Sequence, residues 1–277
     1  MPPRVAVTGA SGQLGRALIA LAGDDWDITG TSSSHVDVRD WNAVRAWIAT
    51  VRPDFVIHAG AMTDVDGCES RAEDAYAINA LGSRHVAAAA ARIGAQLVYV
   101  STNFVFDGEL DRPYHEFDQP NPMSVYGASK LAGEREVLRQ GSAAYIVRTA
   151  MVYDETGHNF VNTMKRLMAE RESISVVADQ FGNPTFAPDL ATGILELLRF
   201  RPPGTYHLTN TGSTSWHGWA SEIARLTDFG GSVEPIDAAS YVRAATPPAN
   251  GVMTSLAWPE AIEHLPDWRD ALARCLG

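Results

Sequence analysis

The sequence has few cysteines and no long apolar run. Among its 277 residues, Cys68 and Cys275 are the only cysteines, and they form neither a CxxC pair nor a cluster with metal-ligand spacing. No apolar stretch approaches the ~20 residues that span a bilayer. The short apolar run at 5–7 leads directly into glycines, which is typical of a first strand and not of a signal segment. We therefore expect a cytoplasmic chain with reduced cysteines and no membrane partner.

Positive charge is also scarce. The chain has 22 Lys and Arg against 33 Asp and Glu, for a formal net charge of −11. Non-specific nucleic-acid binding needs basic side chains that replace phosphate counterions, so no nucleic-acid partner is expected. A phosphate ligand remains compatible, because backbone amides and one or two cations suffice to bind it. The eight histidines show no HExxH or paired spacing, and no metal site is predicted.

Strand-like and helix-like segments alternate through the first half of the chain. This pattern predicts a parallel sheet with helices on both faces. The expected strands are Arg4–Thr8, Trp26–Gly30, Phe55–Ala59, Gln96–Ser101 and Ala144–Thr149, and the expected helices are Gln13–Ala22, Trp41–Val51, Ala72–Ile93 and Ser124–Gln140.

The second half is less regular. Helices are expected at Asn159–Glu172, Pro188–Phe200 and Trp216–Thr227, strands at Ile174–Val177 and Gly204–Leu208, and a loop-rich, proline-containing tail after them. The predicted fold is α/β: a Rossmann-type doubly wound parallel sheet with a smaller C-terminal substrate-binding domain. The NAD(P)-binding domain is assigned to 1–150 plus about 174–208, and the substrate-binding domain to about 151–173 and 209–277.

A glycine-rich loop follows the first strand directly. Gly9, Gly12 and Gly15 have GxxGxxG spacing, and the loop leads into a helix near Gln13. Such a loop needs glycine where the backbone adopts a conformation that side chains block and where a pyrophosphate approaches the amides. The free N–H groups of the helix then favour the phosphate. The loop therefore predicts a dinucleotide site, although a tight strand–helix turn without a ligand has the same spacing.

The second strand does not decide between NADH and NADPH. It ends in Thr31 and the serines 32–34, with neither the acid that binds a ribose 2′-hydroxyl nor an arginine for a 2′-phosphate. These serines suit either group, and NADPH is slightly favoured. Asp37 is either an acceptor for the adenine amine or part of a surface turn.

Tyr126 and Lys130 are four residues apart on a predicted helix and therefore share a face. A ketone that accepts a hydride needs a proton at its oxygen, and a nearby ammonium lowers the pKa of a phenol that supplies it. The preceding strand ends near Thr102, whose hydroxyl can donate to the same oxygen. The glycine loop, the strand-end hydroxyl and the Tyr–Lys helix together predict a reductase site.

These residues resemble the extended short-chain dehydrogenase/reductase family, and within it the dTDP-4-dehydrorhamnose reductases. The resemblance covers nearly the whole chain, and the last four matching stretches lie outside the cofactor motifs. The matches are TGASGQLG (8–15), HAGAMTDVDGCE (58–69), VSTNFVFDG (100–108), VYGASKLAGE (125–134), RTAMVYD (148–154), NF (159–160), DQFGNPT (179–185), YHLTNTGSTSW (206–216) and LPDWRDAL (265–272).

The resemblance implies NAD(P)H-dependent reduction of the C4 keto group of a nucleotide-linked 6-deoxy sugar, dTDP-4-dehydrorhamnose to dTDP-rhamnose, and a possible homodimer. It implies Thr102, Tyr126 and Lys130 as catalytic residues. Around the cofactor it implies Gly9, Ser11, Gly12, Gln13, Leu14, Asp37, Val38, Ala59, Gly60, Ala61 and Lys130. Around the substrate it implies Thr63, Val65, Thr102, Asn103, Phe104, Tyr126, Met151, Asn159, Gln180 and Thr185.

Several sugar-pocket positions depart from the family pattern. Asn103 and Phe104 replace an acid and a phenol, and Met62 and Met151 replace an aromatic residue and a tryptophan. Two alternatives therefore stay open. One is a 4-ketoreductase for a different nucleotide sugar, and the other is a non-catalytic regulatory subunit similar to the β-subunit of methionine adenosyltransferase.

Overall fold

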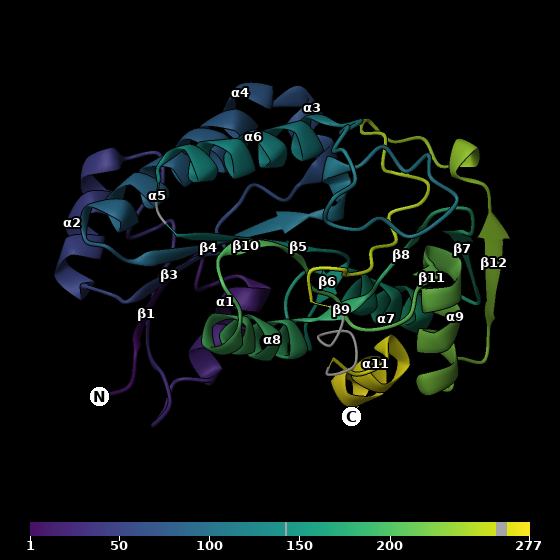
Figure 1. The fold of residues 1–277 in the computed structure, drawn as a ribbon. Coiled ribbons are helices and arrows are strands. Elements are labelled where there is room, and N and C mark those ends of the chain that lie inside the picture. Colours follow the sequence, from purple (N-terminus) through teal and green to yellow (C-terminus); the bar gives the residue numbers. More distant parts are fainter. Residues whose placement is uncertain (142, 259–264) are drawn as a thin grey trace.

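A six-stranded parallel sheet forms the centre of the protein (Figure 1). The computed structural model describes residues 1–141, 143–258 and 265–277. The strand order across the sheet is β2-β1-β3-β4-β5-β10. The strands are β1 (Arg4–Thr8), β2 (Asp27–Thr31), β3 (Phe55–His58), β4 (Gln96–Thr102), β5 (Ala144–Thr149) and β10 (Gly204–His207). Every residue of β5 is buried, as expected for a parallel strand covered on both faces.

Helices cover both faces of this sheet (Figure 1). On one face, Leu18 and Ile194 pack in a core with Val7; on the other, Val44 and Val86 pack with Val56. The helices of the first face are α1 (Gln13–Ala20) and α8 (Ala187–Phe200), and those of the second are α2 (Trp41–Val51), α5 (Ser83–Arg92) and α6 (Val125–Arg139). The predicted doubly wound fold is confirmed. None of the helices in the described ranges has the length and apolarity needed to cross a bilayer.

A separate core lies beyond the carboxyl ends of the strands, and Trp219 and Trp268 are buried in it. It contains α7 (Phe160–Glu170), β7 (Ser173–Val177), α9 (Trp216–Leu226), β12 (Ser232–Ile236) and α11 (Trp268–Leu276). The described part of the second half also contains two short strand pairs, β6 (Val152–Tyr153) with β9 (Thr185–Phe186) and β8 (Phe181–Gly182) with β11 (Thr214–Ser215), and the 3₁₀ turn η3 (Ala238–Ser240).

Two segments of the second half have pairing or structure that the sequence did not indicate. The strand near 174–177 was assigned to the NAD(P)-binding domain, and β7 pairs with β12 and not with the large sheet. Its alternate residues are exposed, which is the pattern of a strand with one solvated face. The tail, expected to be loop-rich, also contains β12 and α11. Pro235 is tolerated in β12 because a two-stranded sheet has only edge strands.

The long helix expected over Ala72–Ile93 is interrupted by a π-helical segment. It consists of α4 (Ala72–Tyr76), the π segment η1 (Ala77–Gly82) and α5, preceded by the separate helix α3 (Val65–Ser70). Single π turns inside α-helices occur frequently at functional sites. In this chain the π segment places Ile78 in the lining of the large cleft.

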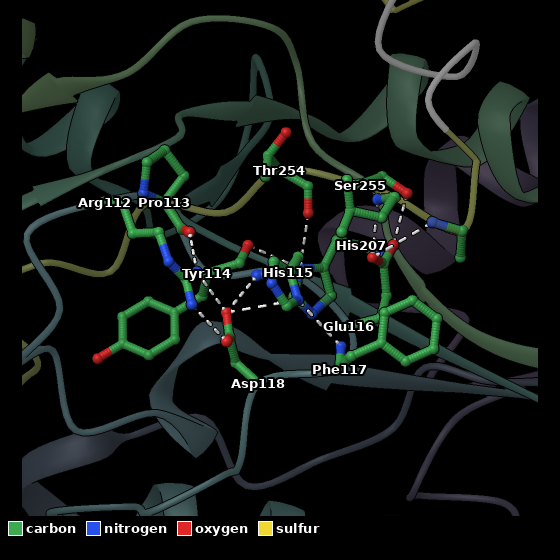
Figure 2. A network of polar contacts seen from close by, with 12 residues as sticks. Arg112, Pro113, Tyr114, His115, Glu116, Phe117, Asp118, His207, Thr254 and Ser255 are labelled. Atoms are coloured by element: carbon green, nitrogen blue, oxygen red, sulfur yellow. Dashed lines mark hydrogen bonds and ion pairs between the residues drawn. The ribbon is translucent and has the colours of Figure 1, made fainter.

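A buried polar network fixes the C-terminal segment to the end of β10 (Figure 2). The Glu116 carboxylate accepts hydrogen bonds from the backbone N–H groups of His207 and Leu256, both at 2.9 Å, and from the Ser255 hydroxyl. The Nδ1 atom of His207 faces two carbonyl oxygens, those of Tyr114 and Thr254, so it carries the proton. Burial lowers the pKa of His207 and keeps it neutral. The network therefore holds the C-terminal segment at Ser255 and Leu256 against the end of β10.

Candidate active site

A cleft of about 840 Å³ opens at the carboxyl edge of the sheet. It lies where the strand order reverses, between β1 and β3, which is where open α/β sheets bind ligands. All eleven predicted cofactor residues line it, namely Gly9, Ser11, Gly12, Gln13, Leu14, Asp37, Val38, Ala59, Gly60, Ala61 and Lys130.

The glycine loop leaves no room for a side chain at Gly9 or Gly15. Gly9 has φ +74°, and a Cβ atom there would lie 2.6 Å from the Gly60 nitrogen. A Cβ atom on Gly15 would lie 2.2 Å from the Gly9 carbonyl oxygen. The N-terminus of α1 has no side-chain cap, so its amides are not blocked by a side chain. These residues fit a dinucleotide pyrophosphate.

The three predicted catalytic side chains converge in the cleft. Thr102 ends β4, and Tyr126 and Lys130 lie on the first turns of α6, whose N-cap Ser124 accepts the Gly127 N–H at 3.1 Å. Burial raises the pKa of Tyr126 to about 12, against the opposing effect of a hydrogen bond with Thr102. The phenol is therefore protonated at neutral pH, the state that a proton donor needs.

Lys130 does not lower the pKa of Tyr126, although their spacing on the helix predicted that it would. Its Nζ donates to the Val100 carbonyl oxygen at 2.6 Å and lies 4.1 Å from the centroid of the Tyr99 ring. Burial lowers the pKa of Lys130 itself to about 7, while Glu134 opposes this shift. The expected effect is missing because desolvation dominates both groups, and a half-neutral amine gives little Coulomb stabilisation to a phenolate.

Asn79, in the π segment, holds the cleft walls together and was not singled out from the sequence. Its side chain is completely buried. It exchanges hydrogen bonds with the Met62 backbone at 2.8 and 3.1 Å and donates to the Ser129 hydroxyl at 3.0 Å. In the sequence, Asn79 could have been found as a lone amide among the apolar residues of a predicted helix, because a buried amide needs several hydrogen-bond partners.

A buried ion pair that was not predicted from the sequence lies one helical turn after Lys130 on α6. Glu134 and Arg148 are both buried and form a bidentate ion pair at 2.7 and 2.9 Å. The Ser101 hydroxyl also donates to Glu134. This pair joins α6 to β5 and thereby fixes the helix that carries Tyr126 and Lys130. His58, by contrast, is a packed neutral residue bonded to Thr8 and Ser83.

Seven of the ten predicted substrate residues line the cleft: Thr63, Val65, Thr102, Asn103, Phe104, Tyr126 and Met151. Phe104 packs edge-on against Tyr126 with ring centroids 5.4 Å apart. The Asn103 amide donates to the Gly251 carbonyl oxygen at 3.1 Å and accepts from Thr102 at 3.3 Å. Met151 has φ +48°, a strained conformation for a side chain that faces the cleft.

The structure does not bring Asn159, Gln180 and Thr185 into the cleft lining. The Asn159 amide caps α7 and donates to the Gln13 side chain at 2.9 Å, so it contacts the lining from behind. Thr185 is completely buried, and its hydroxyl donates to the Asn183 carbonyl oxygen. These three residues lie in the folded C-terminal part, where only the tertiary structure decides which side chains reach the cleft.

The three acids near 64–69 each have a different partner. Asp64 caps α3, Glu69 accepts the Val125 N–H at 2.8 Å, and Asp66 binds Arg243 at 3.0 and 3.1 Å. The Asp66–Arg243 pair joins α3 to the C-terminal segment across 177 positions of the chain. The three carboxylates therefore fix α3, whose first residue Val65 lines the cleft, to α6 and to the C-terminal segment.

The fold and the site define a class of protein. A doubly wound parallel sheet, a glycine loop at its switch point and a Thr–Tyr–Lys set at the end of β4 and on α6 are the features of an extended short-chain dehydrogenase/reductase.

Comparison with known proteins places the chain more narrowly. The model of the RmlD substrate binding domain family matches residues 3–277, and the chain belongs to this family. A dTDP-4-dehydrorhamnose reductase of Streptomyces griseus is 42% identical, over 98% of this chain and 92% of the relative. A probable dTDP-4,6-dihydroxy-2-methyloxan-3-one 4-ketoreductase of Streptomyces antibioticus is 39% identical, over 96% and 92%. A crystal structure of dTDP-4-dehydrorhamnose reductase from Bacillus anthracis with NADP superimposes with a TM-score of 0.94, at 39% identity over 99% of this chain and 98% of that one.

Proposed function

We propose that the protein reduces the C4 keto group of a dTDP-linked 6-deoxy sugar, dTDP-4-dehydrorhamnose, with NADPH or NADH. The observation that carries this proposal is the convergence of Thr102, Tyr126 and Lys130 in a cleft that also contains the glycine loop. The names of the relatives at about 40% identity support the same reaction.

The bound dinucleotide supplies the hydride that goes to the carbonyl carbon. Tyr126, kept protonated by burial, donates its proton to the carbonyl oxygen, and Thr102 orients that oxygen. Lys130, on the same face of α6 as Tyr126, would hold the nicotinamide ribose. The eleven cofactor residues named above surround the dinucleotide, and Thr63, Val65, Asn103, Phe104 and Met151 surround the sugar.

The proposal also covers the organisation of the chain. Residues 1–150 together with α8 and β10 form the dinucleotide-binding domain, and the core around Trp219 forms the substrate-binding domain. A cytoplasmic location agrees with two free, buried cysteines. Homodimer formation stays a prediction, which light scattering of the purified protein measures.

The test is turnover of a panel of nucleotide 4-ketosugars by the purified protein. We expect NAD(P)H oxidation with dTDP-4-dehydrorhamnose and formation of dTDP-rhamnose. A higher kcat/KM for a different ketosugar would identify that ketosugar as the substrate and leave the proposed type of reaction unchanged. Tight cofactor binding without turnover of any ketosugar would contradict the proposal and favour a regulatory subunit.

The lowered pKa of Lys130 predicts that the protein takes up a proton when it binds the cofactor. Its pKa of about 7 in the free protein leaves it mostly neutral at pH 8, and the negative charge of the dinucleotide favours the ammonium. We expect an uptake of about 0.8 proton at pH 8 and close to none at pH 6, if the bound pKa exceeds about 9. Calorimetry in buffers with different ionisation enthalpies measures this uptake, and Lys130→Met should abolish it.

The same shift affects stability with a defined sign. The unfolded lysine has a pKa of about 10.4, so between pH 7 and pH 10 the unfolded chain binds more protons than the folded one. The contribution of Lys130 to the free energy of unfolding therefore rises with pH across this window. For the calorimetric prediction, a proton uptake on cofactor binding that does not change between pH 6 and pH 8 would contradict the pKa assigned to Lys130.

A further inference from the structure

The buried carboxylate of Glu134 binds two neighbouring strands of the large sheet. It accepts the Ser101 hydroxyl of β4 at 2.5 Å and the Arg148 guanidinium of β5 at 2.7 and 2.9 Å. Ser101 and Arg148 lie opposite each other in the register of these strands. All three residues are at most 5% exposed, so water does not compete for these hydrogen bonds. One carboxylate of α6 therefore holds β4 and β5 together beside the catalytic helix.

Ser101 lies between two residues that contact the catalytic groups. The Val100 carbonyl oxygen, before it, accepts the Lys130 Nζ at 2.6 Å. Thr102, after it, is hydrogen-bonded to Tyr126. A displacement of Ser101 moves both neighbours, because planar peptide bonds join them to it. The hydrogen bond from Ser101 to Glu134 thus fixes the end of β4 relative to α6.

The helix α6 also packs very closely on β4 at this point. A Cβ atom on Gly133 would lie 2.2 Å from the Tyr99 hydroxyl oxygen. The same hydroxyl donates to the Lys130 carbonyl oxygen at 3.3 Å. The backbone of α6 therefore approaches β4 closely enough for the short Ser101 side chain to reach Glu134.

Glu134 also determines the charge environment of Lys130, which lies four residues earlier on the same face of α6. Three other titratable groups lie around the ammonium: Tyr126 on α6, Tyr99 on β4 and His58 on β3. Burial raises the pKa of both phenols and lowers the pKa of His58 to about 3, so all three are neutral at pH 7. Burial lowers the pKa of Lys130 to about 7, and the negative charge of Glu134 opposes this shift.

We infer that Glu134 is a positioning residue for the reduction: it holds the end of β4 against α6 so that the three catalytic side chains converge, and it keeps a carboxylate one helical turn from the Lys130 ammonium. Glu134 does not line the cleft, so it acts through Ser101 and Lys130. A misplacement of about 1 Å can cost about 10²-fold in rate. The inference rests on the proposed function, because the groups that it positions are those of the reductase.

Ser101→Ala tests the hydrogen bond and leaves the ion pair with Arg148 in place. We expect kcat to fall about tenfold, while KM for the ketosugar stays within about twofold, because alignment in the transition state is lost and ground-state contacts are kept. Steady-state kinetics with NADPH measure both constants. A higher KM with an unchanged kcat would show that the Ser101 hydroxyl binds the sugar, and would overturn its role as the link to Glu134.

Glu134→Met/Arg148→Met tests the carboxylate itself without leaving an unpaired charge in the interior. We expect kcat to fall about 10²-fold in a variant that thermal unfolding shows to be folded. Without the carboxylate, Lys130 loses its proton at a lower pH, so proton uptake on NADPH binding at pH 6 should exceed the wild-type value. Ser101→Ala keeps the charge and should keep the wild-type uptake.

The matched control is Glu136→Gln, which removes another carboxylate of α6 that pairs with the exposed Arg139. It should keep the wild-type kcat and proton uptake. A folded Met/Met variant that keeps more than about a third of the wild-type kcat, or that follows the wild-type curve of uptake against pH, overturns the inference. If this variant does not fold, Glu134→Gln keeps an acceptor for Ser101, and an unshifted uptake curve in it overturns the inference as well.

The failure of the proposed function has a different signature. A wild-type protein that binds NADPH and turns over no ketosugar contradicts the proposed reaction. The calorimetric uptake curves need no turnover, and in that case they alone support or overturn the role of Glu134.

Discussion

Replacing Tyr126 with phenylalanine is expected to lower kcat about 10³-fold. The ring is retained, so packing against Phe104 changes little, but the group proposed to protonate the carbonyl oxygen is gone. General acid catalysis by a positioned side chain contributes typically 10²–10⁴-fold. Steady-state kinetics with NADPH and the ketosugar measure the loss, and calorimetry should show an NADPH Kd within about twofold of wild type.

The matched control for this variant is Tyr76→Phe, on α4. The Tyr76 side chain is 43% exposed, and Tyr126 is 9% exposed within the cleft. The control should retain full activity. A Tyr126→Phe protein that keeps more than a tenth of the wild-type kcat would show that another group, or water, delivers the proton.

Replacing Arg148 with methionine is expected to destabilise the protein by about 3–5 kcal/mol. The change leaves the Glu134 carboxylate buried without its ionic partner, and an unpaired buried charge costs far more than the pair contributes. Thermal unfolding should show a fall in Tm on the order of 10 °C. Urea unfolding, where it is reversible, gives the free energy directly.

Two further variants identify the cause of that loss. In Glu134→Met/Arg148→Met no charge is left to bury, and the double variant should regain more than half of the lost stability. Arg166→Met breaks an exposed ion pair with Glu170 and should change the free energy of unfolding by less than about 0.5 kcal/mol. If Arg148→Met alone costs under 1 kcal/mol, the pair does not fix α6.

Much of the dinucleotide half was predictable because its signals are local. The spacing of Gly9, Gly12 and Gly15 and the alternation of strands and helices follow from neighbouring residues in the chain. The tail was harder to predict, because its prolines indicated loops, whereas β12 and α11 form by packing on β7 and the core around Trp219. Long-range pairing overrode the local preference there.

The predicted substrate residues also fall into two groups, those near strands of the large sheet and those in the C-terminal part. Thr63, Phe104 and Met151 lie within five residues of the carboxyl ends of β3, β4 and β5 and line the cleft. Asn159 and Thr185 lie in the C-terminal part, where their side chains are used for a helix cap and for a turn. The fold class predicts which strand ends face a ligand, but not how a second domain packs over them.

The sequence by itself determined the individual strands of the large sheet, the glycine loop and the shared helix face of Tyr126 and Lys130, because each depends on residues within a few positions of one another. The tertiary structure decided the protonation of those two side chains, since burial sets the pKa of Tyr126 near 12 and that of Lys130 near 7. It also decided the partners of Glu134 and Asp66. Those contacts join residues 14 and 177 positions apart, and no local pattern encodes them.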